Sequence, residues 1–226
     1  MPISRSTYHS SLYQAFQEIE QSDYRTQVRF YEERRRQIVN LDEQESFDLL
    51  VTYMRALFEL GMYGKYLQRV DLVLEISIAQ NIQFFKGRDL FCDLLYQKAA
   101  SHYQMMEYER ADYTARELIK IAPDYPNVHL LLKRIIRKSQ PQFTKLIQAA
   151  AVICFIVAAA VIVVEIFYVR TFYADSPYLG WIESGRIGLL LLGMLVYALG
   201  ELFLVWRADR KTSTFITEVK KRKGYL

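Results

Sequence analysis

The chain has 226 residues, of which 52% are hydrophobic and 24% charged, and its formal net charge is +4. This composition excludes a wholly disordered chain and a collagen-like or low-complexity one. Two cysteines, Cys92 and Cys154, are too few for a disulfide framework or a four-ligand zinc site.

Residues 6–140 carry apolar side chains at helical spacing almost throughout, and this pattern predicts about seven helices. The first is expected near Tyr8 to Ile19. Ser22 or Asp23 caps the second, which carries apolar residues as far as Ile38. The third runs from about Glu45 to Leu60. The remaining four carry apolar faces over 67–78, 91–102, 108–119 and 128–138, with a loop near 81–87.

Three segments, 22–38, 61–77 and 106–126, align with one another, and each has a turn, then Tyr24, Tyr63 or Tyr108, then an amphipathic helix. This pattern resembles the tetratricopeptide repeat (TPR). The third segment matches best, through Ala99, Tyr108, Ala111 and Pro123, whereas the second has Tyr66 where a small residue is expected. The tyrosine spacings of 39 and 45 exceed the usual repeat of about 34. An irregular helical bundle and another α-solenoid therefore stay open.

The resemblance implies that the first helix of each pair lines a concave surface that binds a peptide or a partner helix. By the family pattern, the residues of this surface are His9, Leu12, Phe16, Asp48, Val51, Arg55, Phe58, Asp93, Tyr96 and Tyr103.

Two apolar runs follow, 146–164 with 19 residues and 187–206 with 20. A helix needs about 20 apolar residues to cross a bilayer, so the runs predict two membrane spans. The alternative is a pair of buried core helices, but such helices usually keep a polar face. The predicted fold class is therefore all-α, with an irregular TPR-like helical-hairpin stack followed by two transmembrane helices.

The flanks of the runs predict their orientation. Residues 133–145 have a net charge of +5, and residues 207–226 also have +5. Because basic segments stay on the cytoplasmic side, both chain termini are expected there. The predicted organisation is a cytoplasmic domain over 1–140, a first transmembrane helix over 141–169, an external connector over 170–186, a second transmembrane helix over 187–206 and a basic cytoplasmic tail over 207–226.

Several residues of the predicted hairpin have distinct expected roles. Glu201 lies inside the second run, and Glu165 ends the first run on the far side. An acid at the depth of Glu201 requires protonation, pairing or hydration, so it either bonds a neighbouring helix or lines an oligomeric pore. Gly193 and Gly200 share one helix face and serve packing within the hairpin or in a homo-oligomer. The residues expected to attract anionic lipid are Lys220, Lys221, Arg222 and Lys223.

Enzymatic motifs are missing from the sequence. It contains no phosphate-binding glycine loop, no nucleophile elbow and no H-E-x-x-H motif, and its three histidines are isolated. We therefore expect no enzyme, no cofactor and no metal site. Residues 1–132 have a net charge of −4, so a nucleic-acid partner is not expected.

The sequence predicts an integral membrane adaptor that binds a protein or peptide partner through residues 1–140 at the cytoplasmic face. The alternative hypothesis is an oligomerising membrane effector, pore-forming or membrane-disrupting, that the soluble domain controls. Depolarisation dependent on residues 146–206 would favour this effector.

Overall fold

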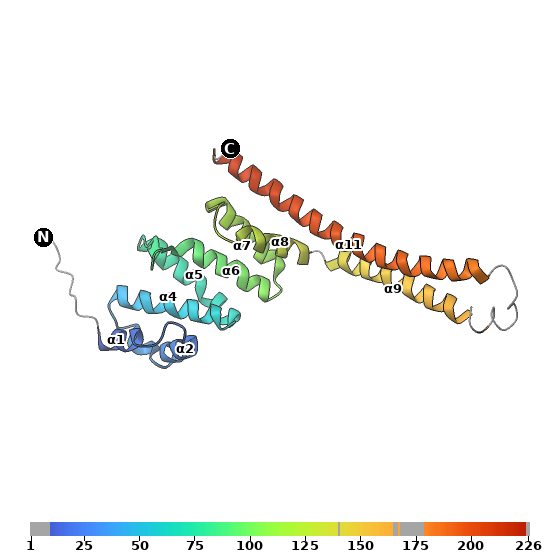
Figure 1. Cartoon of the computed structure of the whole chain (residues 1–226). Coiled ribbons are helices and arrows are strands. Elements are labelled where there is room, and N and C mark those ends of the chain that lie inside the picture. Colours follow the sequence, from blue (N-terminus) through green and yellow to red (C-terminus); the bar gives the residue numbers. More distant parts are fainter. Residues whose placement is uncertain (1–9, 140, 165–166, 168–178, 225–226) are drawn as a thin grey trace. The chain divides into compact units, whose positions relative to one another are not determined.

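The computed structural model describes residues 10–139, 141–164, 167 and 179–224 (Figure 1). These residues are helical apart from turns and one two-stranded hairpin, so the predicted all-α fold class is confirmed. The chain divides into two compact units, residues 1–131 and 132–226.

Short helices and helical hairpins make up the first unit. Its elements are α1 (Ser11–Gln17), α2 (Tyr24–Glu33), α3 (Arg35–Ile38), α4 (Glu43–Glu59), α5 (Tyr63–Ala79), β1 (Phe84–Phe85), β2 (Arg88–Asp89), α6 (Leu90–Gln104) and α7 (Tyr108–Ile121). Each of α4, α5 and α6 packs against the next helix along the chain (Figure 1). The predicted second helix ends earlier than expected, because Arg34 leaves the helical region and separates α2 from α3.

The three repeat tyrosines mark three helix starts. Tyr24, Tyr63 and Tyr108 are the first residues of α2, α5 and α7. Before Tyr63, the Met62 N–H donates to the Leu57 carbonyl, and Gly61 has a φ of +72°. The same 6→1 bond recurs before Tyr108, where the preceding helix also ends in a left-handed residue. The second and third aligned segments therefore share local structure as well as sequence.

Small buried residues let the helices of the stack approach closely. Ala99 and Ala111 are fully buried where α6 packs against α7. Tyr66, which departs from the repeat pattern, is also fully buried, and its hydroxyl donates to the Leu94 carbonyl of α6 at 3.2 Å. This tyrosine therefore joins one hairpin to the next, and burial raises its pKa well above the usual value.

A short β-hairpin replaces part of the predicted loop between α5 and α6. Phe84 pairs with Asp89 and Phe85 with Arg88 in antiparallel register. The two turn residues, Lys86 and Gly87, both have positive φ, at 48° and 78°. Positive φ at both central residues defines the turn type that fits the twist of two-residue hairpins.

Three helices occupy the remaining described chain, namely α8 (Val128–Lys138), α9 (Pro141–Val164) and α11 (Leu179–Arg222). α9 runs alongside α11 in the second unit (Figure 1). Both contain a stretch long and apolar enough to cross a membrane. α11 has 44 residues, about 66 Å of helix rise. It includes the predicted connector from 179 and the predicted tail as far as Arg222, so both segments are helical there.

Candidate functional site

A groove of about 490 Å³ opens in the first unit, where residues from α2, α4, the β-hairpin and α6 meet. This volume lies within the range of about 300–1,000 Å³ that is typical of ligand pockets. Its lining residues are Gln21, Ser22, Tyr24, Gln27, Val51, Thr52, Arg55, Phe85, Lys86, Arg88, Leu90, Asp93, Leu94 and Gln97.

Helical spacing explains how α4 and α6 present these side chains. Val51 and Arg55 are four residues apart, as are Asp93 and Gln97, so each pair lies on one helix face. The Asp89 carboxylate accepts a hydrogen bond from the Cys92 N–H at 2.9 Å and caps α6 at its start. This cap fixes the β-hairpin directly before the groove-lining turn of α6.

The electrostatic character of the groove is basic. Its three cationic side chains, Arg55, Lys86 and Arg88, are exposed, and none has a carboxylate partner among the described residues. Asp93 is the groove's acidic residue, and its carboxylate accepts a hydrogen bond from the Tyr125 hydroxyl. Burial, followed by the hydrogen bond to Asp93, raises the pKa of Tyr125, so this hydroxyl keeps its proton at neutral pH.

Three of the ten residues predicted for the concave surface line this groove, namely Val51, Arg55 and Asp93. Val51 is 6% exposed, so its side chain forms the floor. Arg55 is exposed on the next turn of α4. The structure therefore brings together predicted residues from two different hairpins.

The other predicted residues that the structure describes lie in packing contacts. Phe16 is buried, with its ring 5.4 Å from that of Phe30, and Leu12 is half-buried in the same helix. Asp48 accepts a hydrogen bond from the Tyr13 hydroxyl at 3.1 Å, which joins α4 to α1. Phe16 therefore packs against α2, and Asp48 belongs to the contact between α1 and α4.

Aromatic pairing accounts for the remaining three. Phe58 meets the rings of Tyr63 and Tyr66 edge to face within the α4–α5 hairpin. Tyr96 lies against Tyr125, and Tyr103 lies against Tyr108, with ring centroids 5.6 and 5.8 Å apart. His9 lies outside the described residues.

Sequence reasoning missed the contribution of loops to the groove. The segment before α2 supplies Gln21 and Ser22, and the β-hairpin supplies Phe85, Lys86 and Arg88. The dipeptide Lys86-Gly87 is a weak turn signal, because hairpins of this type usually carry Asn-Gly or Asp-Gly. Hydrophobic periodicity has no means of detecting polar loop residues.

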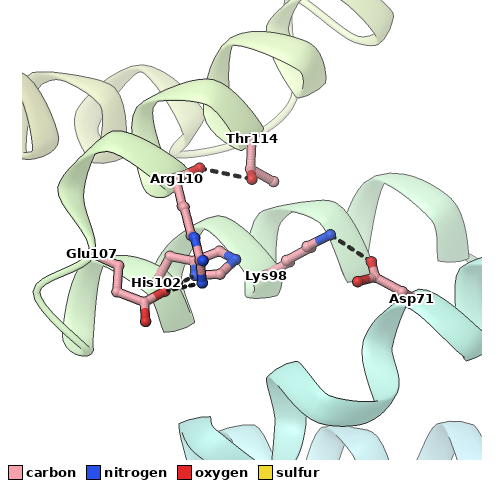
Figure 2. Close-up of polar contacts among 6 residues, drawn as sticks. All are labelled: Asp71, Lys98, His102, Glu107, Arg110 and Thr114. Carbon is pink, nitrogen blue, oxygen red and sulfur yellow. Dashed lines mark hydrogen bonds and ion pairs between the residues drawn. The ribbon is translucent and has the colours of Figure 1, made fainter.

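A second depression, of about 670 Å³, lies over α5, α6 and α7. Its polar residues engage one another (Figure 2). Lys98 binds Asp71 across α6 and α5, and His102 Nδ1 lies 2.7 Å from Glu107 Oε2. Arg110 also reaches Glu107, at 3.3 Å. We interpret this cluster as a polar connection between hairpins, and His102 as a partnered histidine at the end of α6.

The glycines of α11 pack against α9. A methyl group added at Gly193 would lie 3.2 Å from Cys154 Cβ, and one at Gly200 would overlap the side chain of Ile147. Both glycines therefore serve the contact within the α9–α11 pair. This is the first of the two roles that the sequence left open.

Glu201 has a partner in α8, since Arg137 donates to its carboxylate. Lys133 of α8 binds Asp209 of α11 at 2.9 Å, two helical turns further along α11. Glu165 lies outside the described residues. The four basic residues 220–223 lie at the end of α11, and Arg222 pairs with Glu218 at 2.6 Å.

Within the described residues, no three His, Cys, Asp or Glu side chains are grouped so that they could hold a metal ion. Comparison with models of protein families, with curated proteins and with solved structures gives no match. The described residues therefore define the class of this protein by structure alone: an all-α helical-hairpin stack with a basic groove, followed by two long apolar helices.

Proposed function

We propose that this chain is an integral membrane adaptor whose TPR-like helical stack binds an acidic segment of a partner protein in the basic groove. The two apolar helices cross the membrane as a hairpin, with both chain termini in the cytoplasm. The chain thereby concentrates the partner at the membrane surface. The observation that carries this proposal is the groove, because it combines a buried floor with exposed cations from separate elements.

The exposure of the two long helices supports membrane insertion. Only 11% of the apolar window in α9 and 17% of that in α11 is buried. In a soluble protein, the apolar surface of a core helix is buried by other parts of the protein. In a membrane protein, the apolar surface of a spanning helix contacts lipid instead. Ile156 and Leu202, for example, are 63% and 65% exposed.

The basic blocks support the proposed orientation. Lys and Arg cluster before α9 and after the apolar part of α11, and loops with such an excess stay in the cytoplasm. The stack precedes α9 in the chain, so it lies on the same side. This arrangement makes the groove accessible to cytoplasmic proteins.

The repeat-like construction of the stack supports a binding role. α2, α5 and α7 begin at equivalent tyrosines, and α4 and α6 supply the groove with residues from the first helices of their hairpins. Stacked helical hairpins form extended concave surfaces of this kind. A partner segment with Asp or Glu side chains complements Arg55, Lys86 and Arg88.

The contacts of Glu201 and the two glycines support an adaptor over a pore-forming effector. A pore-lining carboxylate faces a water-filled conduit, whereas that of Glu201 is paired with Arg137. Gly193 and Gly200 pack against side chains of α9 in the same chain. None of these contacts specifically supports the effector hypothesis.

Proximity labelling with the full chain tests the proposal. A biotin ligase fused to Met1 should label a membrane-associated partner in cells that express the wild-type chain. Arg55→Glu should reduce that labelling, because it reverses a charge in the groove. Arg36→Glu makes the same change at an exposed residue outside the groove and should preserve it. Equal labelling by both variants would show that the groove is not the contact surface.

A membrane-potential dye tests the rival function in the same cells. The adaptor predicts no depolarisation on expression of the full chain, and no difference between wild type and Glu201→Ala. Depolarisation that Glu201→Ala abolishes would instead establish a conduit and overturn the adaptor.

A further inference from the structure

Three segments of the second unit converge near residues 200–211 of α11. Arg137 binds Glu201, and Lys133 binds Asp209, so α8 lies beside this part of α11. Gly200 meets Ile147, which places the first turns of α9 there as well. The three contacts bring the basic residues of α8, α9 and α11 into one region.

This region has a large excess of positive charge. Residues 132–145 and 200–211 together contain eight basic and two acidic side chains, a net charge of +6. Both acids are already paired with α8. The exposed cations with no carboxylate partner among the described residues form what we call the basic collar: Arg134, Lys138, Lys145, Arg210 and Lys211.

An aromatic residue of interfacial type lies within the collar. Trp206 is 53% exposed, and the Arg210 guanidinium lies 5.2 Å from its ring. Tryptophan favours the membrane–water interface, so it marks the depth of the lipid headgroups along α11. Arg210 follows by four residues and Lys211 by five, which corresponds to about 6–7.5 Å of helix rise.

The basic residues at the end of α11 are much further from that depth. Lys220 lies 14 residues beyond Trp206, about 21 Å along the helix. Attraction to a charged surface decays over about 8–10 Å at physiological salt. A lipid contact at residues 220–223 therefore requires an α11 axis strongly inclined towards the surface, whereas the collar needs no inclination.

We propose that the basic collar is a binding site for the headgroups of anionic phospholipids, with Trp206 beside the bound lipid. The proposal rests on the membrane placement in the proposed function, and it moves the main lipid contact from the end of α11 to the collar. The phosphate oxygens are acceptors for the Arg and Lys donors. α8 and α11 supply this site jointly, because Lys133 and Arg137 hold α8 at the acids of α11.

Fluorescence quenching by brominated lipids tests the proposal on the full chain. Trp181→Phe leaves Trp206 as the single tryptophan. The chain is reconstituted in vesicles of phosphatidylcholine with phosphatidylglycerol. In one preparation phosphatidylcholine carries bromine near the headgroup end of its acyl chain, and in a second preparation phosphatidylglycerol does. Quenching by both lipids reports insertion, and excess quenching by phosphatidylglycerol reports the collar.

We expect Trp206 to associate with phosphatidylglycerol at least about fivefold more strongly than with phosphatidylcholine, the factor that one basic residue near the surface contributes. In this background, Arg134→Gln, Lys138→Gln and Lys211→Gln together should lower that ratio at least about fivefold, because three of the five collar cations are lost. The matched control, Lys220→Gln, Lys221→Gln and Lys223→Gln, removes the same charge from the end of α11 and should leave the ratio unchanged.

Each outcome has a distinct meaning. If neither lipid quenches Trp206, the membrane placement is wrong, and the proposed function fails with it. Equal quenching by the two lipids, or an equal effect of the two triple variants, would overturn the collar and leave the adaptor standing. Loss of the preference with soluble glycerophosphate would assign the site to a free phosphate, which also overturns the lipid proposal. Quenching by phosphatidylcholine that persists in both variants shows that they still insert.

Discussion

Of Gly185, Gly188, Gly193 and Gly200 in α11, Gly200 lies closest to the side chains of α9. A Cβ placed there would lie 3.0 and 3.1 Å from Ile147 Cδ1 and Cγ1, and still closer to Cγ2. Because isoleucine in a helix has one strongly preferred χ1 rotamer, its Cγ2 cannot swing away without strain. Gly200→Ala should therefore force α9 and α11 apart or distort Ile147.

The magnitude follows from two opposing effects. Overpacking of a close contact costs about 1–3 kcal/mol. Replacing glycine by alanine in a helix gains up to about 1 kcal/mol from propensity. At Gly188, where nothing lies within 4 Å, only the gain applies. At Gly193 the nearest atom, Cys154 Cβ, is 3.2 Å away, so the expected loss falls between the other two.

Unfolding of the full chain in detergent micelles by added sodium dodecyl sulfate measures these differences, with tryptophan fluorescence and helical circular dichroism as readouts. We expect Gly200→Ala to be the least stable, then Gly193→Ala, then Gly188→Ala. Ile147→Ala in the Gly200→Ala background should recover part of the loss, because it removes the overlapping atoms. Equal midpoints for Gly200→Ala and Gly188→Ala would refute the close contact.

Three further substitutions test other contacts. Arg137→Gln leaves the Glu201 carboxylate without its cation and should cost up to about 1 kcal/mol in the same detergent titration, because the pair is partly exposed. Tyr66→Phe removes a buried hydrogen bond and should lower the free energy of unfolding in urea by about 1 kcal/mol. The bond with His102 lowers the pKa of Glu107 from 4.5, so its stabilisation is present above that value and is lost as the pH falls through the folded pKa. Glu107→Gln should therefore flatten the loss of stability below about pH 4.5.

Matched variants decide whether these effects are specific. Arg134→Gln removes an exposed cation of α8 and should leave the stability of the α9–α11 pair nearly unchanged. Tyr63 is only half-buried as a residue, so Tyr63→Phe should cost less than Tyr66→Phe. Glu109→Gln alters an exposed acid of α7 and should lose stability at low pH in the same way as the wild type. A control that behaves like its test variant contradicts the corresponding contact.

Local chemistry explains why the helices of the stack were predictable. Asp23 accepts a hydrogen bond from the Thr26 N–H at 3.1 Å and starts α2 where the capping pattern predicts. Gly61 takes the positive φ that ends α4, and Tyr108 opens α7. Each of these signals acts within four or five residues, so a single sequence contains it whole.

The groove depends on contacts that no local pattern contains. Arg55 of α4 and Asp93 of α6 line it together although they are 38 residues apart. Asp48 had the same predicted role, but its carboxylate accepts a hydrogen bond from Tyr13 of α1, about two helical turns before Arg55. Which residue of a helix faces the groove depends on where the neighbouring helices pack. The β-hairpin was missed because Lys86 adopts a positive φ that lysine rarely takes.

Glu201 shows the same principle within the apolar hairpin. Its partner Arg137 is 64 residues away along the chain, so the sequence alone left pairing, protonation and a pore as alternatives. The pairing changes what the carboxylate does: it fixes α8 beside α11 instead of leaving a charge against lipid. Asp209 pairs with Lys133 in the same way, about two helical turns further along α11. Since these two acids neutralise only two of the eight surrounding cations, they position the basic collar without cancelling it.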